Sequence, residues 1–263
     1  MSDAVKIYKE DGIGFLALNR PDKLNALNKD IFDGIAKGVK EFDKDNDVSV
    51  VVIYGEGRAF CAGLDFKDFL GRFRPENFKS TEDLYNAVYE YVVFMQDSFS
   101  VIENSKKVYI AAINGFCVGG GLDLAATCDI RVASRDAVFS IMETQVGVID
   151  DLGALQRLPR IIGEGHTKYL AFTSDKISSN EAYRMGLVEK ITETKKELLL
   201  LAKKIAKNIS SKRKKAVFGT KIALHHLREH TVAESLLFTA KSNADLFDPQ
   251  LLMENFLKNI GKK

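Results

Sequence analysis

The sequence predicts an α/β fold followed by a helical C-terminal region. Short β-branched runs alternate with amphipathic segments in the first half of the chain, and helical patterns accumulate later. The chain shows no internal repeat and no low-complexity linker, and its 263 residues suffice for one large domain or a domain with a small appendage. We expect a core at 1–195 and a helical region at 196–263.

The N-terminal segment predicts a β-hairpin, because two alternating strands flank the turn-forming pair Asp11-Gly12. A helix capped by Asn28 follows. Its apolar positions recur at helical spacing, which predicts a buried stripe of Ile31, Ile35, Val39 and Phe42, with Phe32 beside it.

The middle of the chain predicts two buried strands around a long helix. The strands are "VSVVVIYGEG" and "VYIAAING", and the helix runs from Leu84 to Ile102. A glycine loop, the short helix "GGLDLAAT" and two further strands, "DIRVAS" and "AVFSI", come next. Beyond Gly153 we expect only helices, beginning with "ALQRLPRIIG" and "EGHTKYLAF".

Composition and charge exclude several classes of function. The net charge of +2 offers no global field for a nucleic acid. A basic run at 202–215 is interleaved with Leu201, Ile205 and Ile209 at helical spacing, which favours a solvated helix face over an RNA site. The cysteines Cys61, Cys117 and Cys128 lack metal-ligand spacing, so we expect reduced thiols and no metal.

The chain carries no recognisable targeting signal. The N-terminus "MSDAVKIYKEDGIG" has no apolar signal-peptide core, the C-terminus "NIGKK" is not a peroxisomal tripeptide, and no apolar run is long enough to span a bilayer. We therefore expect a cytoplasmic protein without a membrane partner.

Two glycine motifs carry most of the functional information. They are "GEGRAFCAGLD" (55–65) and "NGFCVGGGLDL" (114–124), and each follows a buried strand, where open α/β sheets bind ligands. Glycine lets the backbone approach a ligand, and Gly120 lies at a helix start, where its N–H has no intrahelical partner. The alternative is a pair of tight strand-to-helix turns. Neither motif has the spacing of a P-loop or a dinucleotide fingerprint, and the chain has no nucleophile elbow.

These two motifs, with "NRPDKLNAL" upstream and "LQRLPRIIG" downstream, resemble the enoyl-CoA hydratase/isomerase (crotonase) family. The resemblance runs from about Ile13 to the C-terminal helices. It implies a crotonase-type spiral of repeated ββα units, whose C-terminal helices build a homotrimer or a dimer of trimers. It also implies an acyl-CoA thioester substrate and no cofactor beyond the coenzyme A of that substrate.

The resemblance also assigns the binding residues. The thioester carbonyl is expected between the backbone N–H groups of Leu64 and Gly120, which would stabilise the enolate formed when a neighbouring proton is removed. Candidates to line the coenzyme A nucleotide and pantetheine are Lys23, Leu24, Ala62, Gly63, Asp65 and Lys67.

Three carboxylates suggest the branch of the family. Hydratases carry a glutamate after the glycine triplet and another in the segment matching "SIMET"; here these positions are Asp123 and Glu143, and Asp151 follows. This set resembles the branch that converts 3,5-dienoyl-CoA to 2,4-dienoyl-CoA in fatty-acid β-oxidation. We expect Asp151 to take the C2 proton and Glu143 to deliver one to C6, or the reverse. Asp123 then orients the pair, and Asp150 is structural.

Other interpretations stay open. Asp123 could instead stabilise a helix start, and Asp151 could cap the following helix. A hydratase could hold water between Asp123 and Glu143. A dehalogenase is disfavoured because the chain has no tryptophan. A non-catalytic relative that binds acyl-CoA or RNA is supported only by the lysine cluster at 203–215.

Overall fold

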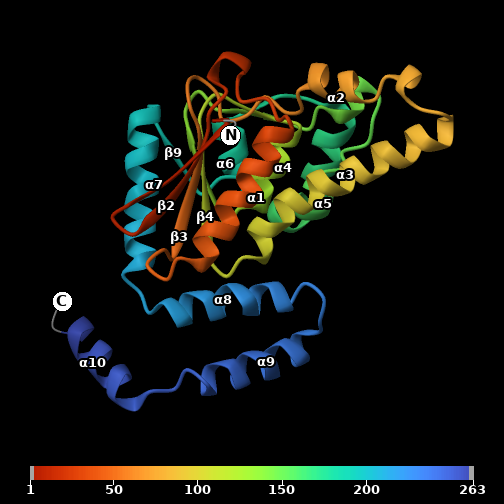
Figure 1. Cartoon of the computed structure of the whole chain (residues 1–263). Coiled ribbons are helices and arrows are strands. Elements are labelled where there is room, and N and C mark those ends of the chain that lie inside the picture. The colour runs from red at the N-terminus through yellow and green to blue at the C-terminus, as the bar shows by residue number, and fades with distance from the viewer. Residues whose placement is uncertain (1–2, 261–263) are drawn as a thin grey trace. The chain divides into compact units, whose positions relative to one another are not determined.

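The computed structural model describes residues 3–260, and the chain divides into two compact units between Ser211 and Lys212 (Figure 1). The first unit includes helix α7 (Lys195–Ser210), because that helix packs on the main sheet. The division predicted from the sequence, with the acyl-CoA site in 1–195 and the oligomerising helices in 196–263, stays a prediction.

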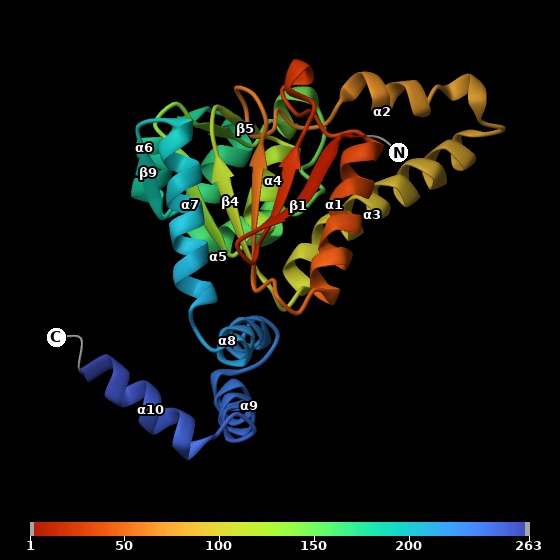
Figure 2. The same ribbon diagram turned by 60° about the vertical axis from the view of Figure 1, so that its left-hand side comes forward.

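A six-stranded sheet forms the centre of the first unit (Figures 1 and 2). Its order is β1-β2-β3-β4-β6-β9, and only β1 and β2 pair antiparallel. Strands β2, β3 and β4 are buried along their whole length, as expected for parallel strands covered on both faces. The strands are β1 (Val5–Glu10), β2 (Ile13–Leu18), β3 (Val50–Gly55), β4 (Val108–Ile113), β6 (Ile130–Ser134) and β9 (Lys190–Thr192).

Helices cover both faces of this sheet. On one face α1 (Lys29–Lys44) packs against β1, β2 and the long helix α3 (Thr81–Asn104), and on the other α7 crosses the strands (Figure 1). The Asn28 side chain accepts a hydrogen bond from the Ile31 N–H, and the predicted stripe of α1 is buried. The predicted hairpin is also confirmed, with φ of 52° at Asp11 and 75° at Gly12.

A smaller sheet of order β5-β7-β8 lies beside the glycine motifs. Its strands are β5 (Phe116–Val118), β7 (Val138–Ser140) and β8 (Ile177–Ser178). The remaining elements of the first unit are α2 (Phe66–Arg72), α4 (Gly120–Thr127), α5 (Ala154–Thr173), α6 (Ser179–Met185) and the 3-10 turns η1 (Pro21–Lys23), η2 (Pro75–Asn77) and η3 (Glu143–Val146).

The expectation of helices alone beyond Gly153 is wrong at two places. Strand β8 pairs with β7, and β9 pairs in parallel with β6 at the edge of the main sheet. Strands of two or three residues are too short to show a period of two, so only tertiary pairing reveals them. The two helices expected after Gly153 form one kinked element, α5, which bends at Gly163 where φ is +80°.

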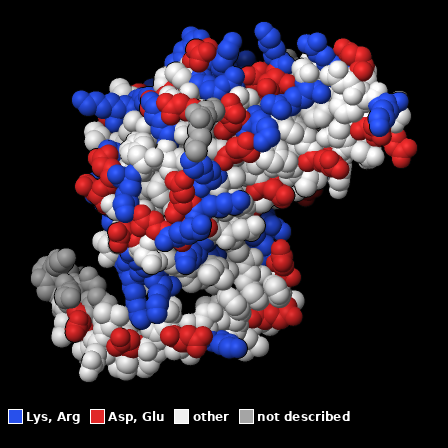
Figure 3. Space-filling view, in the orientation of Figure 1, with Lys and Arg blue, Asp and Glu red and all other residues white. Residues whose placement is uncertain are grey.

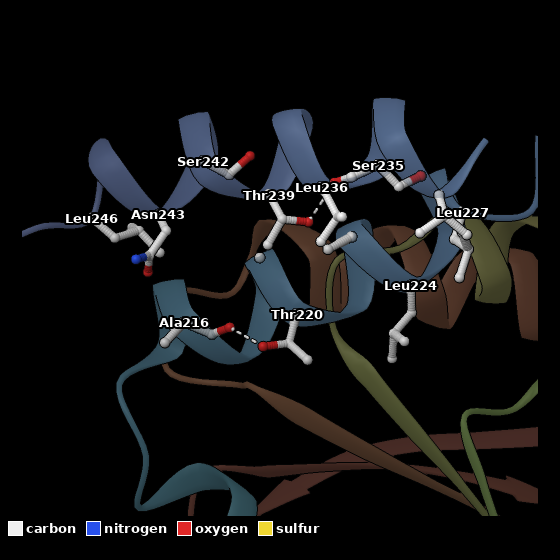
Figure 4. Close-up of a pocket in the computed structure, with 13 residues that line it drawn as sticks. Ala216, Thr220, Leu224, Leu227, Ser235, Leu236, Thr239, Ser242, Asn243 and Leu246 are labelled. Atoms are coloured by element: carbon white, nitrogen blue, oxygen red, sulfur yellow. Dashed lines mark hydrogen bonds between the residues drawn. The ribbon is translucent and has the colours of Figure 1, made fainter. Parts of the chain in front are cut away.

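The second unit consists of the helices α8 (Lys214–His226), α9 (Val232–Ala244) and α10 (Pro249–Ile260). A groove of about 380 Å³ runs between α8 and α9 (Figure 4). Its walls carry Leu224, Leu227 and Leu236, which are about half exposed or more. Among the described helices of the protein, none combines the length and apolarity needed to cross a membrane.

Candidate active site

The loop after β2 and the first glycine motif are joined by a short backbone ladder. The Ala62 N–H donates to the Leu24 carbonyl at 3.0 Å, and the Leu27 N–H donates to the Gly63 carbonyl at 2.8 Å. The Asp65 N–H closes the ladder by donating to the Leu27 carbonyl at 2.8 Å. These bonds place Lys23 and Leu24 beside the segment 62–65, so the structure brings together most of the predicted coenzyme A contacts.

Asn25 fixes this arrangement, and the sequence analysis did not single it out. Its side chain is buried; it donates to the carbonyls of Glu56 and Ala59 at 2.9 and 2.8 Å and accepts from the Arg20 N–H at 2.9 Å. Its φ of +57° lies in the left-handed region, which asparagine tolerates better than most residues. In the sequence, an asparagine between two turn-forming segments could have indicated a residue with positive φ whose side chain bonds to the backbone.

The two glycine motifs are paired with each other as well. The Cys61 N–H donates to the Phe116 carbonyl at 2.9 Å, and the Val118 N–H donates back to the Cys61 carbonyl at 3.2 Å. The two motifs therefore run side by side at the carboxyl ends of β3 and β4.

The predicted pair of backbone donors lies at this junction. A Cβ built on Gly120 would lie 3.8 Å from the Leu64 nitrogen, and one built on Gly63 would lie 3.7 Å from the Gly120 nitrogen. Within residues 3–260, neither the Leu64 nor the Gly120 N–H donates to another protein group, and Gly120 is the first residue of α4. Two adjacent unused donors, one at a helix N-terminus, suit an oxygen that gains negative charge.

Glu143 lies directly beside these donors. Its Oε1 is 2.8 Å from the position that a Cβ on Gly119 would occupy, so the carboxyl group rests against the Cα of Gly119. The Gly119 backbone, with φ of 52° and ψ of −131°, has a conformation that suits glycine. Glycine at 119 thus makes room for a carboxyl group next to the Gly120 N–H.

Asp123 is fully buried on the first turn of α4. Its Oδ1 accepts a hydrogen bond from the Ala154 N–H at 2.6 Å, so this side chain caps the N-terminus of α5. Asp123 therefore stabilises the start of α5, whereas the alternative weighed from the sequence concerned its own helix, α4.

Asp150, expected to be structural, is the third member of a buried carboxylate cluster. One oxygen each of Asp123, Glu143 and Asp150 lies within 4.8 Å of the others. Such a set of oxygens could also hold a cation, so the expected absence of a metal stays a prediction. The neighbouring Asp151 is solvent-exposed, and its backbone carbonyl accepts from the Gln96 side chain at 2.7 Å. Its side chain borders an open depression between α3 and α5.

Desolvation and mutual repulsion shift the acidity of this cluster. Burial, reinforced by the charge of Asp150, raises the pKa of Glu143 to about 7. Burial also raises the pKa of Asp123 well above its usual range, with Asp150 and Glu143 adding to the effect. The pKa of Asp151 is raised as well, first by desolvation and then by the charge of Asp150.

The predicted coenzyme A contacts differ in whether their side chains are exposed or already bonded to other groups of the protein. Lys23 and Lys67 are exposed. Asp65 caps α2 by accepting from the Asp68 N–H at 3.2 Å and forms an ion pair with Arg20 at 2.8 Å. Its carboxylate is thus already engaged, and contact with coenzyme A stays a prediction for all of these residues.

An apolar surface adjoins Glu143. Val146, Val148 and Ile149 are 50, 53 and 75% exposed in the segment between Glu143 and Asp150. Exposed aliphatic side chains clustered next to buried acids are typical of a ligand site rather than of ordinary surface.

The chain belongs to the enoyl-CoA hydratase/isomerase family and is an enzyme of that family, because the family model matches residues 8–251. The predicted crotonase-type α/β fold is confirmed. The solved structure of an enoyl-CoA hydratase from Bacillus anthracis superposes with a TM-score of 0.87 and 28% identity, over 97% of this chain and 96% of that chain.

Two further relatives illustrate the range of activities. The chain is 38% identical to the human protein "Delta(3,5)-Delta(2,4)-dienoyl-CoA isomerase, mitochondrial", over 90% of this chain and 73% of that protein. It is 39% identical to a crotonyl-CoA hydratase from Syntrophomonas wolfei, over 98% of this chain and 95% of that protein. Identity therefore does not separate isomerase from hydratase.

Proposed function

We propose that this enzyme converts 3,5-dienoyl-CoA to 2,4-dienoyl-CoA. The observation that carries the proposal is the position of Glu143, whose carboxyl lies against Gly119 beside the two unused N–H donors of Leu64 and Gly120. A base at this point can remove a proton from the carbon next to the thioester carbonyl. The exposed apolar residues at 146–149 offer a surface for the acyl chain.

The geometry favours one of the two role assignments left open by the sequence. In this proposal the thioester carbonyl oxygen accepts from both donors, so C2, bonded to the carbonyl carbon C1, is the carbon nearest Glu143. Glu143 takes the C2 proton, the electrons move along the chain as both double bonds shift by one position, and C6 receives a proton. Asp151, further along the same loop, is the proposed donor to C6, and Asp123 fixes the loop through its bond to Ala154.

The proposed base has a matching acidity. With a pKa of about 7, Glu143 is basic enough to accept a proton and still ionised in a large fraction of molecules near neutrality. The N–H groups of Leu64 and Gly120 stabilise the enolate oxygen; loss of one such donor in comparable sites costs about 3–4 kcal/mol of transition-state stabilisation.

The test is an assay with 3,5-dienoyl-CoA, followed by the absorbance of the conjugated 2,4-dienoyl product, beside a hydration assay with 2-enoyl-CoA. We expect isomerisation to dominate and its rate to rise with pH as Glu143 ionises, and to fall again where the proposed donor Asp151 loses its proton. Asp151→Asn should lower isomerisation by about 10²-fold or more. Hydration without isomerisation would contradict the proposal, and a wild-type rate in Asp151→Asn would remove Asp151 from it.

Hydration of a 2-enoyl-CoA is the second candidate, since Asp123 and Glu143 lie together and a hydratase is among the relatives. Binding of RNA has little support, because Lys203 pairs with Glu10 and Lys207 with Asp11, both at 2.8 Å. Basic and acidic side chains are also interspersed on the face in Figure 3. Salt-dependent RNA retention by the pure protein would revive that alternative.

Assembly and location are part of the same proposal. We infer a homotrimer or a dimer of trimers, for which the mass in solution, measured by light scattering, is the test. We also propose a cytoplasmic location, in line with the expectation from the sequence. Imaging of the tagged protein tests this, since the human relative is named as mitochondrial.

A further inference from the structure

Asp150 is the best-buried acid that the proposed reaction leaves without a role. The residue is 4% exposed, and within the described part of the chain neither of its carboxyl oxygens makes a hydrogen bond of good geometry, although Asp123 and the N–H groups of Gly153, Ala154 and Leu155 lie near enough to oppose the rise of its pKa. A buried carboxylate in this condition is costly unless a proton or an opposite charge compensates it.

The neighbouring Asp123 also has a buried carboxyl oxygen without a hydrogen-bond partner among the described residues. Its Oδ1 is bonded to the Ala154 N–H, but its Oδ2 is buried and lacks a partner among residues 3–260. Since oxygens of the two aspartates and of Glu143 lie within 4.8 Å of one another, the three groups cannot all carry a charge without strong repulsion. One proton held between Asp123 and Asp150 supplies the missing hydrogen bond and removes one charge.

The surroundings favour one remaining negative charge on this pair. The pair faces the start of α5, where the Ala154 N–H and the positive end of the helix dipole stabilise an anion. The other ionisable groups nearby are Glu143 on η3, Asp151 on the same loop, and Arg157 of α5. Arg157 is already paired with Glu103 of α3 at 2.8 Å. The buried thiols of Cys61 and Cys117 lie close to Asp123 and stay protonated, since burial raises their pKa.

We propose that Asp150 is a positioning residue: its carboxyl shares one proton with that of Asp123, and the single negative charge left on the pair strengthens Glu143 as a base. Asp150 itself does not touch the substrate. The catalytic consequence rests on the proposed isomerisation, whereas the shared proton does not. A base next to a fixed negative charge binds its proton more tightly, and a stronger base removes a weakly acidic C–H proton faster.

The experiment combines a titration with a rate profile. The carboxyl groups are labelled with ¹³C and titrated by NMR, with resonances assigned by Asp123→Asn, Glu143→Gln and Asp150→Asn. Asp150→Asn alone abolishes the shared proton but leaves the negative charge of the pair on Asp123, so the coupled titration should disappear while the Glu143 midpoint moves little. The double variant Asp123→Asn/Asp150→Asn removes that charge and keeps hydrogen-bonding groups of similar size, and it should lower the titration midpoint of Glu143 by about one pH unit or more. In the double variant the maximal rate of isomerisation should fall, and the rising limb of the pH profile should move to lower pH.

Asp97→Asn, on the exposed face of α3, makes the same kind of chemical change away from the cluster and should move neither the Glu143 midpoint nor the maximal rate. If the two aspartates are merely structural, the double variant lowers the rate without moving the rising limb, which would overturn the proposal. If the double variant does not fold, the wild type still decides: three carboxyls that titrate as independent groups at ordinary values overturn the shared proton.

The same spectra distinguish a shared proton from a bound cation. Mg²⁺ or Ca²⁺ should leave the cluster resonances unchanged, and a saturable shift would assign the three carboxylates to a cation site instead. A chain that shows the coupled titration but no isomerisation contradicts only the proposed function. A chain that isomerises but shows no coupled titration of Asp123 and Asp150, and an unmoved Glu143 midpoint in the double variant, contradicts only the proposal for Asp150.

Discussion

The two glycine motifs and the segment 140–153 contribute to the same candidate site by different means. The motifs are held in place by backbone hydrogen bonds and by the side chain of Asn25, and they contribute the N–H groups of Leu64 and Gly120. The segment contributes side chains, and its middle, from Thr144 to Ile149, is exposed. The comparison teaches that the donors are fixed by the chain path, whereas the acids depend on which side chain the loop turns inward.

Gly119→Ala should have the largest effect on the glycine motifs. The added Cβ would collide with the Glu143 carboxyl, and the alanine would have to keep a strained φ of +52°. We expect kcat/KM for the acyl-CoA substrate to fall by about 10²-fold or more. The strain should also lower the free energy of unfolding by about 1–3 kcal/mol. Steady-state kinetics and urea unfolding measure both.

Gly71→Ala is the matched control. Among the residues that the structure describes, no atom lies within 4 Å of a Cβ at this position in α2, and its φ is not in the left-handed region. It should keep both activity and stability. Normal turnover by Gly119→Ala would show that Glu143 does not need the space left by the glycine.

Glu143→Gln tests the carboxyl groups of the segment 140–153 through the free energy of unfolding. A folded-state pKa of about 7, above the value of 4.5 for an unperturbed glutamate, means that folding loses stability as pH rises from about 4.5 through 7. The variant cannot ionise, so it should be more stable than the wild type at pH 8 by about 1–3 kcal/mol. At pH 4.5 this advantage should vanish. Urea midpoints at both pH values give the measurement, and an equal difference at both would contradict the raised pKa.

Asp65→Asn should have the smallest effect. Asparagine still caps α2, but the ion pair with Arg20 is lost, which should cost about 0.5–1 kcal/mol of unfolding free energy. KM for the acyl-CoA should stay unchanged, because the protein already occupies this carboxylate. Asp68→Asn, which breaks the more exposed pair with Arg72, is the comparison. A raised KM in Asp65→Asn alone would assign Asp65 to the predicted coenzyme A contact.

The sequence predicted the parts of the molecule that repeat a pattern. The stripe of α1, the buried strands β3 and β4 and the start of α4 at Gly120 followed from periodicity and glycine spacing. Strands β8 and β9 were missed because their pairing partners are distant in sequence. The burial of Asp150 beside Asp123 was missed for a related reason: adjacent residues in a loop have no fixed period, so only packing decides which of two aspartates turns inward.

The two donors at Leu64 and Gly120 belong to the main chain, so among side-chain changes only a substitution by proline would delete either N–H. Each carboxyl group, by contrast, belongs to a side chain and is lost by a single amino-acid substitution. A descendant of this protein could therefore exchange carboxylates and acquire a different reaction on acyl thioesters while keeping the pair of N–H groups that we propose for stabilising the enolate. The similar identities to an isomerase and to a hydratase are what such divergence would leave behind.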